Sequence, residues 1–313
     1  MSSGSKISLV FFGSQQLAAD ILEIIIRSGR FDLKAVVTQP DRPTGRKQEI
    51  KPEPIQKLAE RHGWPVLQPE KLTELVPTLR ALAADIFIVF HYGSILPQEI
   101  IQLPRYGTVN LHPSLLPKYR GASPIRSAIV DGHAETGLTI MLMDEQMDHG
   151  PILAQKKMAI SPDDTAETFT RRLIPVAGDL LLRTIAGWVD GAIQPRAQND
   201  KDATFCKLLA RQDGEINWPS PAQVIYDQYR GLTGWPGVFT FWNGRRLKII
   251  KMKSAVEPAP AGQAVVKNGK IYVGAGDGRS LEILELQIEG KKPITPEQFL
   301  SGHPAIHGSR LGA

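Results

Sequence analysis

The chain has 313 residues, of which 42% are hydrophobic and 22% charged, and its formal net charge is +5. This composition excludes global disorder, and the length fits one large domain or two ordinary ones. The single cysteine, Cys206, excludes a disulfide within the chain and disfavours a cysteine-based zinc cluster. The first residues resemble neither a signal nor a transit peptide, and no apolar run approaches the roughly 18 residues of a membrane span. We therefore expect a cytoplasmic protein, with Met1–Ser5 as a loose start.

The excess of positive charge lies in the C-terminal third. From Lys207 to the end, 14 Lys and Arg stand against 9 Asp and Glu, whereas the first 206 residues carry 23 of each. This asymmetry favours a contact with a polyanion in that part of the chain. A chance distribution explains so modest an excess equally well.

Strands and helices alternate along the first 160 residues. Continuous apolar runs predict buried strands, and apolar residues at helical spacing predict helices. In chain order these elements are strand Ile7–Phe12, a helix from Leu17 that ends near Gly29, strand Leu33–Thr38, helices Ile55–His62 and Thr73–Ala83, strands Asp85–Phe90 and Thr108–Leu111, helix Ile125–Val130 and strand Leu138–Leu142. The order predicts an α/β, Rossmann-like domain with a mostly parallel sheet and helices on both faces.

A long helix and a polar segment follow. The helix is expected from Thr165 to Val189, with a kink at Pro175. Its predicted buried stripe is Phe169, Leu173, Val176, Leu180, Ile185 and Val189. Residues 191–206 are polar and lack apolar periodicity, which predicts a linker between a catalytic domain (1–190) and a second domain (207–313).

The second domain has a different texture. A helix over Pro221–Leu232 precedes short alternating apolar segments. Asn243-Gly244 and Asn268-Gly269 lie between such segments and predict tight hairpins. We expect a small C-terminal β-barrel of the OB-like type.

Several common signatures are absent from the sequence. A single glycine, Gly13, follows the first strand, so the dinucleotide-binding G-x-G-x-x-G pattern is missing. No P-loop motif occurs, which excludes a nucleotide-phosphate site of that type. No G-x-S-x-G motif occurs either, which disfavours a serine hydrolase. His303 and His307 are spaced like half a zinc finger but lack the cysteine pair, so we interpret them as part of a solvated tail.

The segment from Val109 to Pro117 carries the most informative chemistry. Asn110 and His112 alternate with apolar neighbours, so in a strand both polar side chains project from the same face. An amide N–H can donate to a developing oxyanion, and an imidazole can move a proton near neutral pH. The pair therefore suits transfer of an acyl-type group to an amine, although both side chains could also merely satisfy the end of a strand.

A second apolar strand runs into a loop with two aspartates, Asp144 and Asp148. A carboxylate beside His112 would orient the ring and stabilise its charged form. Asp148 is our candidate for this position, and Asp144 could cap a turn instead. Solvation or turn capping is the alternative explanation for either residue.

Together these residues resemble the folate-dependent formyltransferases. The resemblance is carried by Asn110-Leu-His112-Pro-Ser-Leu-Leu-Pro117, by Arg120-Gly121 and by Asp148-His-Gly150. It implies that Asn110, His112 and Asp148 are catalytic and that a formyl group moves from 10-formyltetrahydrofolate to an amine. Asn110 and protonated His112 would stabilise the oxyanion, while Asp148 would help to relay the amine proton. No metal is implied.

The resemblance also implies a folate site made of three segments. The implied residues are Phe90, His91 and Tyr92, the run Ser114, Leu115, Leu116 and Pro117, and Asp144.

Within the family, the chain is most similar to members that formylate initiator methionyl-tRNA for translation initiation. The implied tRNA contacts are Arg42, Arg46, Lys47 and Lys51 in a proline-rich loop, and Arg245, Arg246 and Lys248 in the second domain. On an alternating strand, Arg246, Lys248 and Lys251 share a face only if a bulge intervenes. A solvated charged surface is the other explanation. We expect a monomer that contacts no membrane.

The sequence departs from the family pattern at several positions. Gln15 and Leu17 stand where a proline and an aromatic residue are usual, near the pocket for the acceptor's amino acid. Glu145-Gln146 and Thr233-Gly234 are further departures. The preference for methionine is therefore less firmly implied than formyl transfer.

Three other functions remain open from the sequence. An amino-sugar formyltransferase would keep the Asn-His-Asp trio but would not need the basic loop. A hydrolase releasing formate from the same carrier would differ only in the attacking group. An RNA-binding protein with a decayed formyltransferase fold is disfavoured, because all three residues of the trio are present.

Overall fold

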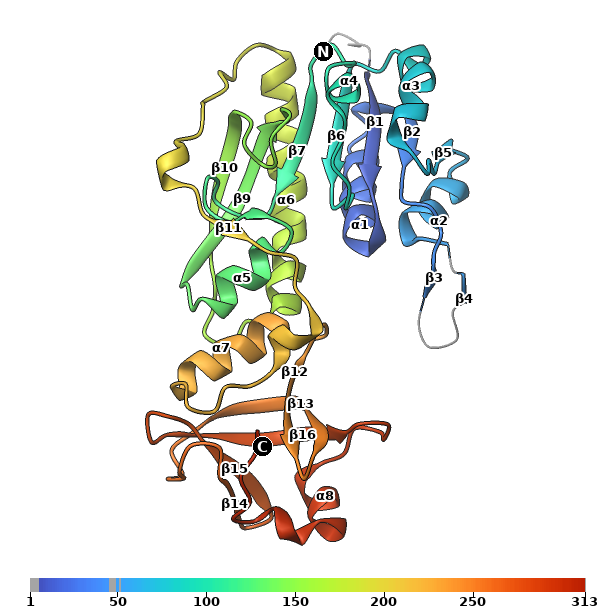
Figure 1. Cartoon of the computed structure of the whole chain (residues 1–313). Helices are drawn as coiled ribbons and strands as arrows, with labels where there is room; N and C mark the ends of the chain where they lie inside the picture. The colour runs from blue at the N-terminus through green and yellow to red at the C-terminus, as the bar shows by residue number, and fades with distance from the viewer. Residues whose placement is uncertain (1–5, 45–48, 51, 313) are drawn as a thin grey trace. The chain divides into compact units, whose positions relative to one another are not determined.

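The computed structural model describes residues 6–44, 49–50 and 52–312 (Figure 1). The chain forms two compact units. The first contains the residues up to Ala122 together with Thr136–Met158 and Arg171–Cys206. The second contains Ser123–Glu135, Ala159–Thr170 and the residues from Lys207 onward. It thus includes two segments that lie within the predicted catalytic domain, while the predicted linker is part of the first unit.

A seven-stranded sheet forms the centre of the first unit, in the order β10-β9-β7-β6-β1-β2-β5. β1 pairs in parallel with β2 on one side and with β6 on the other. β2 also pairs in parallel with β5, and β6 with β7, whereas β7 and β9 are antiparallel. The strands are β1 Ile7–Gly13, β2 Phe31–Val37, β5 Val66–Leu67, β6 Ile86–Phe90, β7 Thr108–His112, β9 Glu135–Leu142 and β10 Ile152–Ala159. The predicted mostly parallel α/β architecture is confirmed.

Helices pack on the sheet through buried apolar residues. The helices are α1 Gln15–Arg27, α2 Pro54–Arg61, α3 Val76–Leu82, α4 Gln98–Ile101 and α6 Ala166–Val189, with 3-10 turns at Leu72–Leu75 and Asp200–Asp202. Leu79 of α3 and Ile100 of α4 belong to one core with Val10, Phe12 and Val89 of the sheet. α1 and α6 touch closely, since a Cβ added at Gly178 would lie 2.6 Å from Ile24.

The long helix α6 differs in one respect from its sequence prediction. It continues through Pro175, and Phe169, Leu173 and Ile185 are buried as predicted. Val176, Leu180 and Val189 are only half-buried, while Ala177 and Leu181 are fully buried. The predicted stripe was therefore wrong by one position at Val176 and Leu180, and the first of these turns packs closely on α1 because Gly178 lies against Ile24.

Two short pairs of strands complete the first unit. β3 (Pro43–Thr44) pairs with β4 (Glu49–Ile50), and β8 (Arg120–Gly121) pairs in parallel with β11 (Phe205–Cys206). The second pair ties the predicted linker to the segment that follows the sequence Ser114–Pro117.

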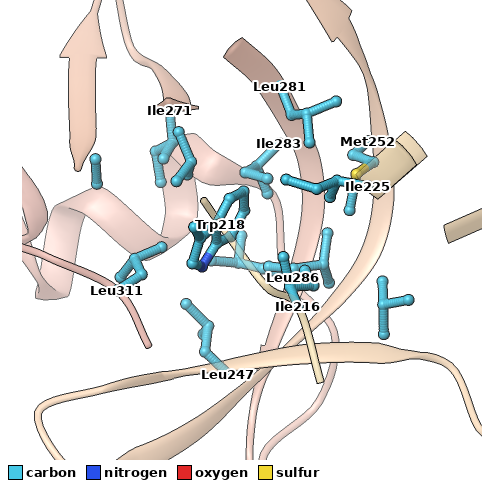
Figure 2. Close-up of a cluster of buried hydrophobic side chains, with 14 of the residues drawn as sticks. Ile216, Trp218, Ile225, Leu247, Met252, Ile271, Leu281, Ile283, Leu286 and Leu311 are labelled. Atoms are coloured by element: carbon cyan, nitrogen blue, oxygen red, sulfur yellow. The ribbon is translucent and has the colours of Figure 1, made fainter. Parts of the chain in front are cut away.

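The second unit is built on a five-stranded antiparallel sheet, in the order β12-β13-β16-β15-β14. Its strands are β12 Val238–Trp242, β13 Arg245–Ala255, β14 Ala264–Lys267, β15 Lys270–Gly274 and β16 Ser280–Ile288. Its helices are α5 Pro124–Val130, α7 Ala222–Leu232 and α8 Pro296–Gly302, with 3-10 turns at Arg211–Gly214 and Pro304–Ile306. Figure 2 shows Trp218 in the core of this unit, where its indole N–H donates to the Thr240 hydroxyl at 2.9 Å.

Both predicted hairpins are present. Asn243-Gly244 joins β12 to β13, and Asn268-Gly269 joins β14 to β15. All four residues have φ between 50° and 73°, which is the left-handed conformation that tight two-residue turns require. The asparagines and glycines occur there because few other residues adopt this conformation without strain.

Candidate active site

Asn110, His112 and Asp148 meet near the carboxyl end of β7, an interior strand of the first unit's sheet. Asn110 and His112 lie two residues apart on β7, and Asp148 lies in the loop that joins β9 to β10. The Asn110 amide Nδ2 donates to Asp148 Oδ1 at 3.3 Å, and His112 Nδ1 lies 3.4 Å from the same oxygen. The alternation of polar and apolar residues along β7 therefore brings both side chains to one carboxylate.

The carboxylate of Asp148 is held on its other side by the backbone. Its Oδ2 accepts a hydrogen bond from the Gly121 N–H at 2.8 Å. The Asp148 side chain is only 13% exposed, so these donors replace much of the water that would otherwise solvate its charge. Its backbone has φ 51°, a left-handed conformation that is uncommon for a residue other than glycine.

The His112 ring is buried and contacts protein groups through both nitrogens. Its Nε2 lies 2.9 Å from the Tyr119 carbonyl oxygen, while Nδ1 faces Asp148. Since a carbonyl oxygen only accepts, Nε2 carries a proton here. A second proton on Nδ1 would then face the carboxylate, so this arrangement accommodates the positively charged ring.

The segment Ser114–Pro117 is held firmly beside the trio. The Thr139 hydroxyl donates to the Ser114 carbonyl at 2.7 Å and accepts from the Leu116 N–H at 3.1 Å. The Gln155 amide donates to the Leu116 carbonyl at 2.8 Å. Ser114 and Leu116 are buried, whereas Leu115 and Pro117 are partly exposed. Leu115 and Pro117 are thus the side chains of this segment that a ligand could contact directly.

The other residues of the predicted folate site occupy three different environments. Phe90 and Tyr92 are buried, and Tyr92 packs edge-on against Phe12. Burial raises the pKa of the Tyr92 hydroxyl to about 12. His91, between them, is exposed. Asp144 accepts from His149 Nδ1 at 2.6 Å, so its carboxylate is already engaged within its own loop.

A polar cluster at the ends of β1, β2 and β6 was not predicted from the sequence. The buried Ser14 hydroxyl lies 3.2 Å from the Thr38 hydroxyl, and Gln39 Nε2 donates to the Tyr92 carbonyl at 3.2 Å and to the Ser94 hydroxyl at 2.8 Å. These residues follow the carboxyl ends of three parallel strands, where ligand sites commonly form in such sheets. That polar residues follow three buried strands was the available signal.

The predicted tRNA-contacting residues fall into two groups. Arg42 is exposed in the first unit, whereas Arg46, Lys47 and Lys51 lie outside the described residues. In the second unit, Arg245 is exposed, and Arg246 and Lys248 are half-buried. The Arg246 guanidinium lies 4.1 Å from the centre of the Phe239 ring.

The bulge that would align the basic residues of the second unit is present in β13. The register against β16 shifts between Ile249 and Lys251 and again between Lys251 and Met252. Leu247, Ile249 and Met252 are buried, so Arg246, Lys248, Lys251 and Lys253 lie on the opposite, outward face. Two of these cations are paired, Lys251 with Glu285 at 3.0 Å and Lys253 with Glu282 at 3.3 Å. Lys251 and Lys253 are exposed but have carboxylate partners, whereas Arg246 and Lys248 are half-buried.

Two further properties concern the described residues. Among residues 6–44, 49–50 and 52–312, no three His, Cys, Asp or Glu side chains gather as a metal site would require. Within the same ranges, none of the helices has the length and apolar composition needed to cross a membrane.

Comparison with known proteins identifies both parts of the chain. Residues 5–185 match the family model described as formyl transferase, and residues 208–304 match the model of the formyl transferase C-terminal domain. A methionyl-tRNA formyltransferase of Acidobacterium capsulatum is 41% identical over 97% of this chain and 99% of its own length. One from Geobacter metallireducens is 40% identical over 98% and 99%, respectively.

A solved structure shares the fold. The N-formyltransferase from Helicobacter canadensis, in complex with folinic acid and dTDP-3-aminofucose, superposes with a TM-score of 0.67. It is 19% identical in sequence, and the match covers 89% of this chain and 98% of that one. At this identity, the likeness supports the fold alone.

Proposed function

The chain belongs to the formyl transferase family, and we propose that it transfers a formyl group to the α-amine of methionyl-tRNA. The observation that carries this proposal is the contact of Asn110, His112 and Asp148 within a chain that is about 40% identical, along nearly its whole length, to methionyl-tRNA formyltransferases. The product, N-formylmethionyl-tRNA, would serve translation initiation in the cytoplasm.

In the proposed reaction, the amine nitrogen attacks the formyl carbon. A new C–N bond forms, the bond to the donor nitrogen breaks, and the proton that the amine loses is passed on to the departing donor nitrogen. Asn110 points one amide hydrogen at Asp148, which leaves its second amide hydrogen to donate to the formyl oxygen as negative charge develops there. The charge of protonated His112 would stabilise the same oxygen, and Asp148 would accept the amine proton.

We propose 10-formyltetrahydrofolate as the formyl donor. The family resemblance implies a folate-type carrier, and a solved structure that shares the fold holds folinic acid. The segment Ser114–Pro117 would contact it through Leu115 and Pro117, and His91 would contact it from the end of β6. The buried side chains of Phe90, Tyr92 and Leu116 would shape this site without touching the donor.

The tRNA would be bound by basic residues of both units. Arg246 and Lys248 suit phosphate contacts, which supply affinity without sequence specificity. The charge asymmetry of the sequence, with its whole excess from Lys207 onward, supports a polyanion contact in the second unit. Arg42, with Arg46, Lys47 and Lys51, would supply contacts from the first unit.

A formyl-transfer assay with three acceptors tests the proposal. Purified protein and labelled 10-formyltetrahydrofolate would be combined with initiator methionyl-tRNA, elongator methionyl-tRNA or a UDP-amino sugar. We expect label on the initiator species only. Label on elongator methionyl-tRNA as well would mean that the tRNA body is not distinguished, and formate release without an acceptor would indicate a hydrolase.

Transfer to an amino sugar is the second candidate. Structural neighbours such as the Helicobacter canadensis enzyme bind a nucleotide-linked amino sugar, but their low identity supports the fold alone. Label on the UDP-amino sugar and none on either tRNA would replace the proposed acceptor, and would leave the basic residues of β13 without a function.

A further inference from the structure

The polar segment 198–206 is built into the scaffold of the candidate active site. The Thr204 hydroxyl accepts from the Tyr119 N–H at 2.9 Å, and the Thr204 carbonyl oxygen accepts from the Arg120 N–H at 2.9 Å. Tyr119 and Gly121 in turn contact His112 and Asp148. This segment therefore supports the groups that hold the trio.

Gln198 makes the most direct connection to the loop that carries Asp148. Its Nε2 donates to the Asp148 carbonyl at 2.9 Å and to the Gly150 carbonyl at 2.8 Å. Its Oε1 accepts from Arg120 Nε at 3.2 Å and Nη2 at 2.9 Å. Both amide hydrogens of Gln198 are thus donated to the loop that carries Asp148, and the amide oxygen accepts both of its hydrogen bonds from Arg120.

Arg120 fixes which way this amide faces. The Arg120 side chain is 5% exposed and is also paired with Asp200 at 2.8 Å. Since a guanidinium only donates, it must face the amide oxygen, and the amide nitrogen must then face the two carbonyls. The orientation of Gln198 is therefore set by a buried charge.

The Asp148 backbone needs such an external restraint. Its left-handed φ of 51° is disfavoured for an aspartate unless its surroundings hold it there. Gly150 packs so tightly that an added Cβ would lie 1.9 Å from the Leu142 carbonyl oxygen. The two carbonyls that Gln198 binds lie at Asp148 itself and at this packed glycine, so Gln198 spans the turn that aims the carboxylate.

From this geometry we infer that Gln198 is a positioning residue for Asp148, with Arg120 holding Gln198 in place. Gln198 acts through the backbone, without touching the reacting atoms. The inference rests on the proposed function, in which Asp148 accepts the amine proton. A displacement of about 1 Å in a catalytic group can lower the rate on the order of 100-fold.

The test compares two glutamines that make the same kind of contact. Gln228 in α7 also donates from Nε2 to two carbonyls, those of Asp213 and Glu215, at 2.9 and 3.0 Å. Gln228 lies in the second unit, whereas Asn110, His112 and Asp148 lie in the first. Gln228→Ala is therefore a matched control for the loss of two side chain to backbone hydrogen bonds.

We expect Gln198→Ala to lower kcat about 10- to 100-fold with KM for both substrates within about threefold of wild type. Gln198→Glu keeps the length and the partner for Arg120 but places a carboxylate oxygen, which cannot donate, against the two carbonyls, so it should lower kcat at least as much. Gln228→Ala should keep wild-type kcat. Melting temperatures would show whether the two alanine variants lose similar stability.

A double-mutant cycle separates positioning from a general structural effect. If Gln198 acts through Asp148, then Gln198→Ala added to Asp148→Asn should lower the residual single-turnover rate by less than about twofold. An undiminished loss in that background, a wild-type kcat in Gln198→Ala, or an equal loss in Gln228→Ala would overturn the inference. Absence of transfer by the wild-type protein would instead contradict the proposed function.

Discussion

The loop between β9 and β10 carries two aspartates, each beside a histidine, and the two pairs differ in nearly every physical respect. Asp144 and His149 are 2.6 Å apart, with side chains 34% and 28% exposed. Asp148 and His112 are 3.4 Å apart, with side chains 13% and 6% exposed. The closer pair is therefore the more solvated one, and water weakens its interaction.

The surroundings of the two carboxylates explain why their roles should differ. Asp144 binds its own loop, through His149 and the Gln146 N–H, and so closes a local turn. Asp148 receives donors from two distant segments, Asn110 and Gly121, and faces a buried ring. The short ion pair thus closes a local turn, whereas the carboxylate shared among buried groups is the one that we propose to be catalytic.

The largest expected effect comes from the shared carboxylate. Asp148→Asn should lower kcat by about 10²- to 10⁴-fold, because it removes the proposed proton acceptor. Asp144→Asn should change kcat far less, since it breaks only the cap. Single-turnover transfer to methionyl-tRNA measures both, and equal losses would mean that the two aspartates are not distinguished by their surroundings.

The Asn110 amide should have the next largest effect. Asn110→Ala removes the proposed donor to the formyl oxygen, which should lower kcat by about 10²- to 10³-fold. Binding of tRNA should be unchanged, because Asn110 lies on β7 and makes no proposed tRNA contact. Gel-shift and transfer measurements on one preparation would check this, and full activity in the variant would remove the oxyanion role.

The fixed end of the same loop can be tested through stability. Gly150→Ala would place a Cβ 1.9 Å from the Leu142 carbonyl oxygen, and should reduce the free energy of unfolding by about 1–3 kcal/mol. Gly302→Ala is the control, because an added Cβ there meets no atom within 4 Å. Urea denaturation of both variants should separate them, and similar curves would argue against a tightly packed loop end.

The more solvated pair, Asp144 and His149, should show the smallest effect, which depends on pH. The hydrogen bond to Asp144 is the main cause that raises the pKa of His149, and Asp200 adds to it while Arg120 opposes it. A raised pKa means that the charged ring stabilises the folded state below the ordinary histidine pKa, and that this stabilisation is lost as pH rises through the folded value. The stability advantage of wild type over His149→Gln should thus be larger near about pH 6 than near about pH 9. Equal differences in urea midpoint at both pH values would contradict it.

Local patterns in the sequence were enough to predict part of this site. The alternation along Thr108–His112 predicts that Asn110 and His112 share a face, and the structure places both beside Asp148. The apolar runs likewise predict the parallel strands that carry them. These features depend on neighbours within a few residues, which periodicity records. The catalytic roles themselves stay predictions.

The supporting segment could not be predicted in the same way. Residues 191–206 have no apolar period, so they were interpreted as a linker, yet Gln198 and Thr204 reach residues 50 or more positions away. Such contacts are made by hydrogen bonds between polar groups, for which the sequence has no periodic signal. The same reason applies to Ser14 and Thr38, which meet only because two parallel strands end side by side.

The bulge in β13 has a consequence for how charge is displayed. Buried residues occupy odd positions up to Ile249 and an even position at Met252, so the strand changes phase by one residue between them. Arg246 and Lys248 precede this phase change, and Lys251 and Lys253 follow it, which is why all four cations face outward. Without the bulge, strict alternation from Leu247 would turn Lys251 and Lys253 inward and Met252 outward, so the cationic surface depends on residue register as well as on the number of lysines and arginines.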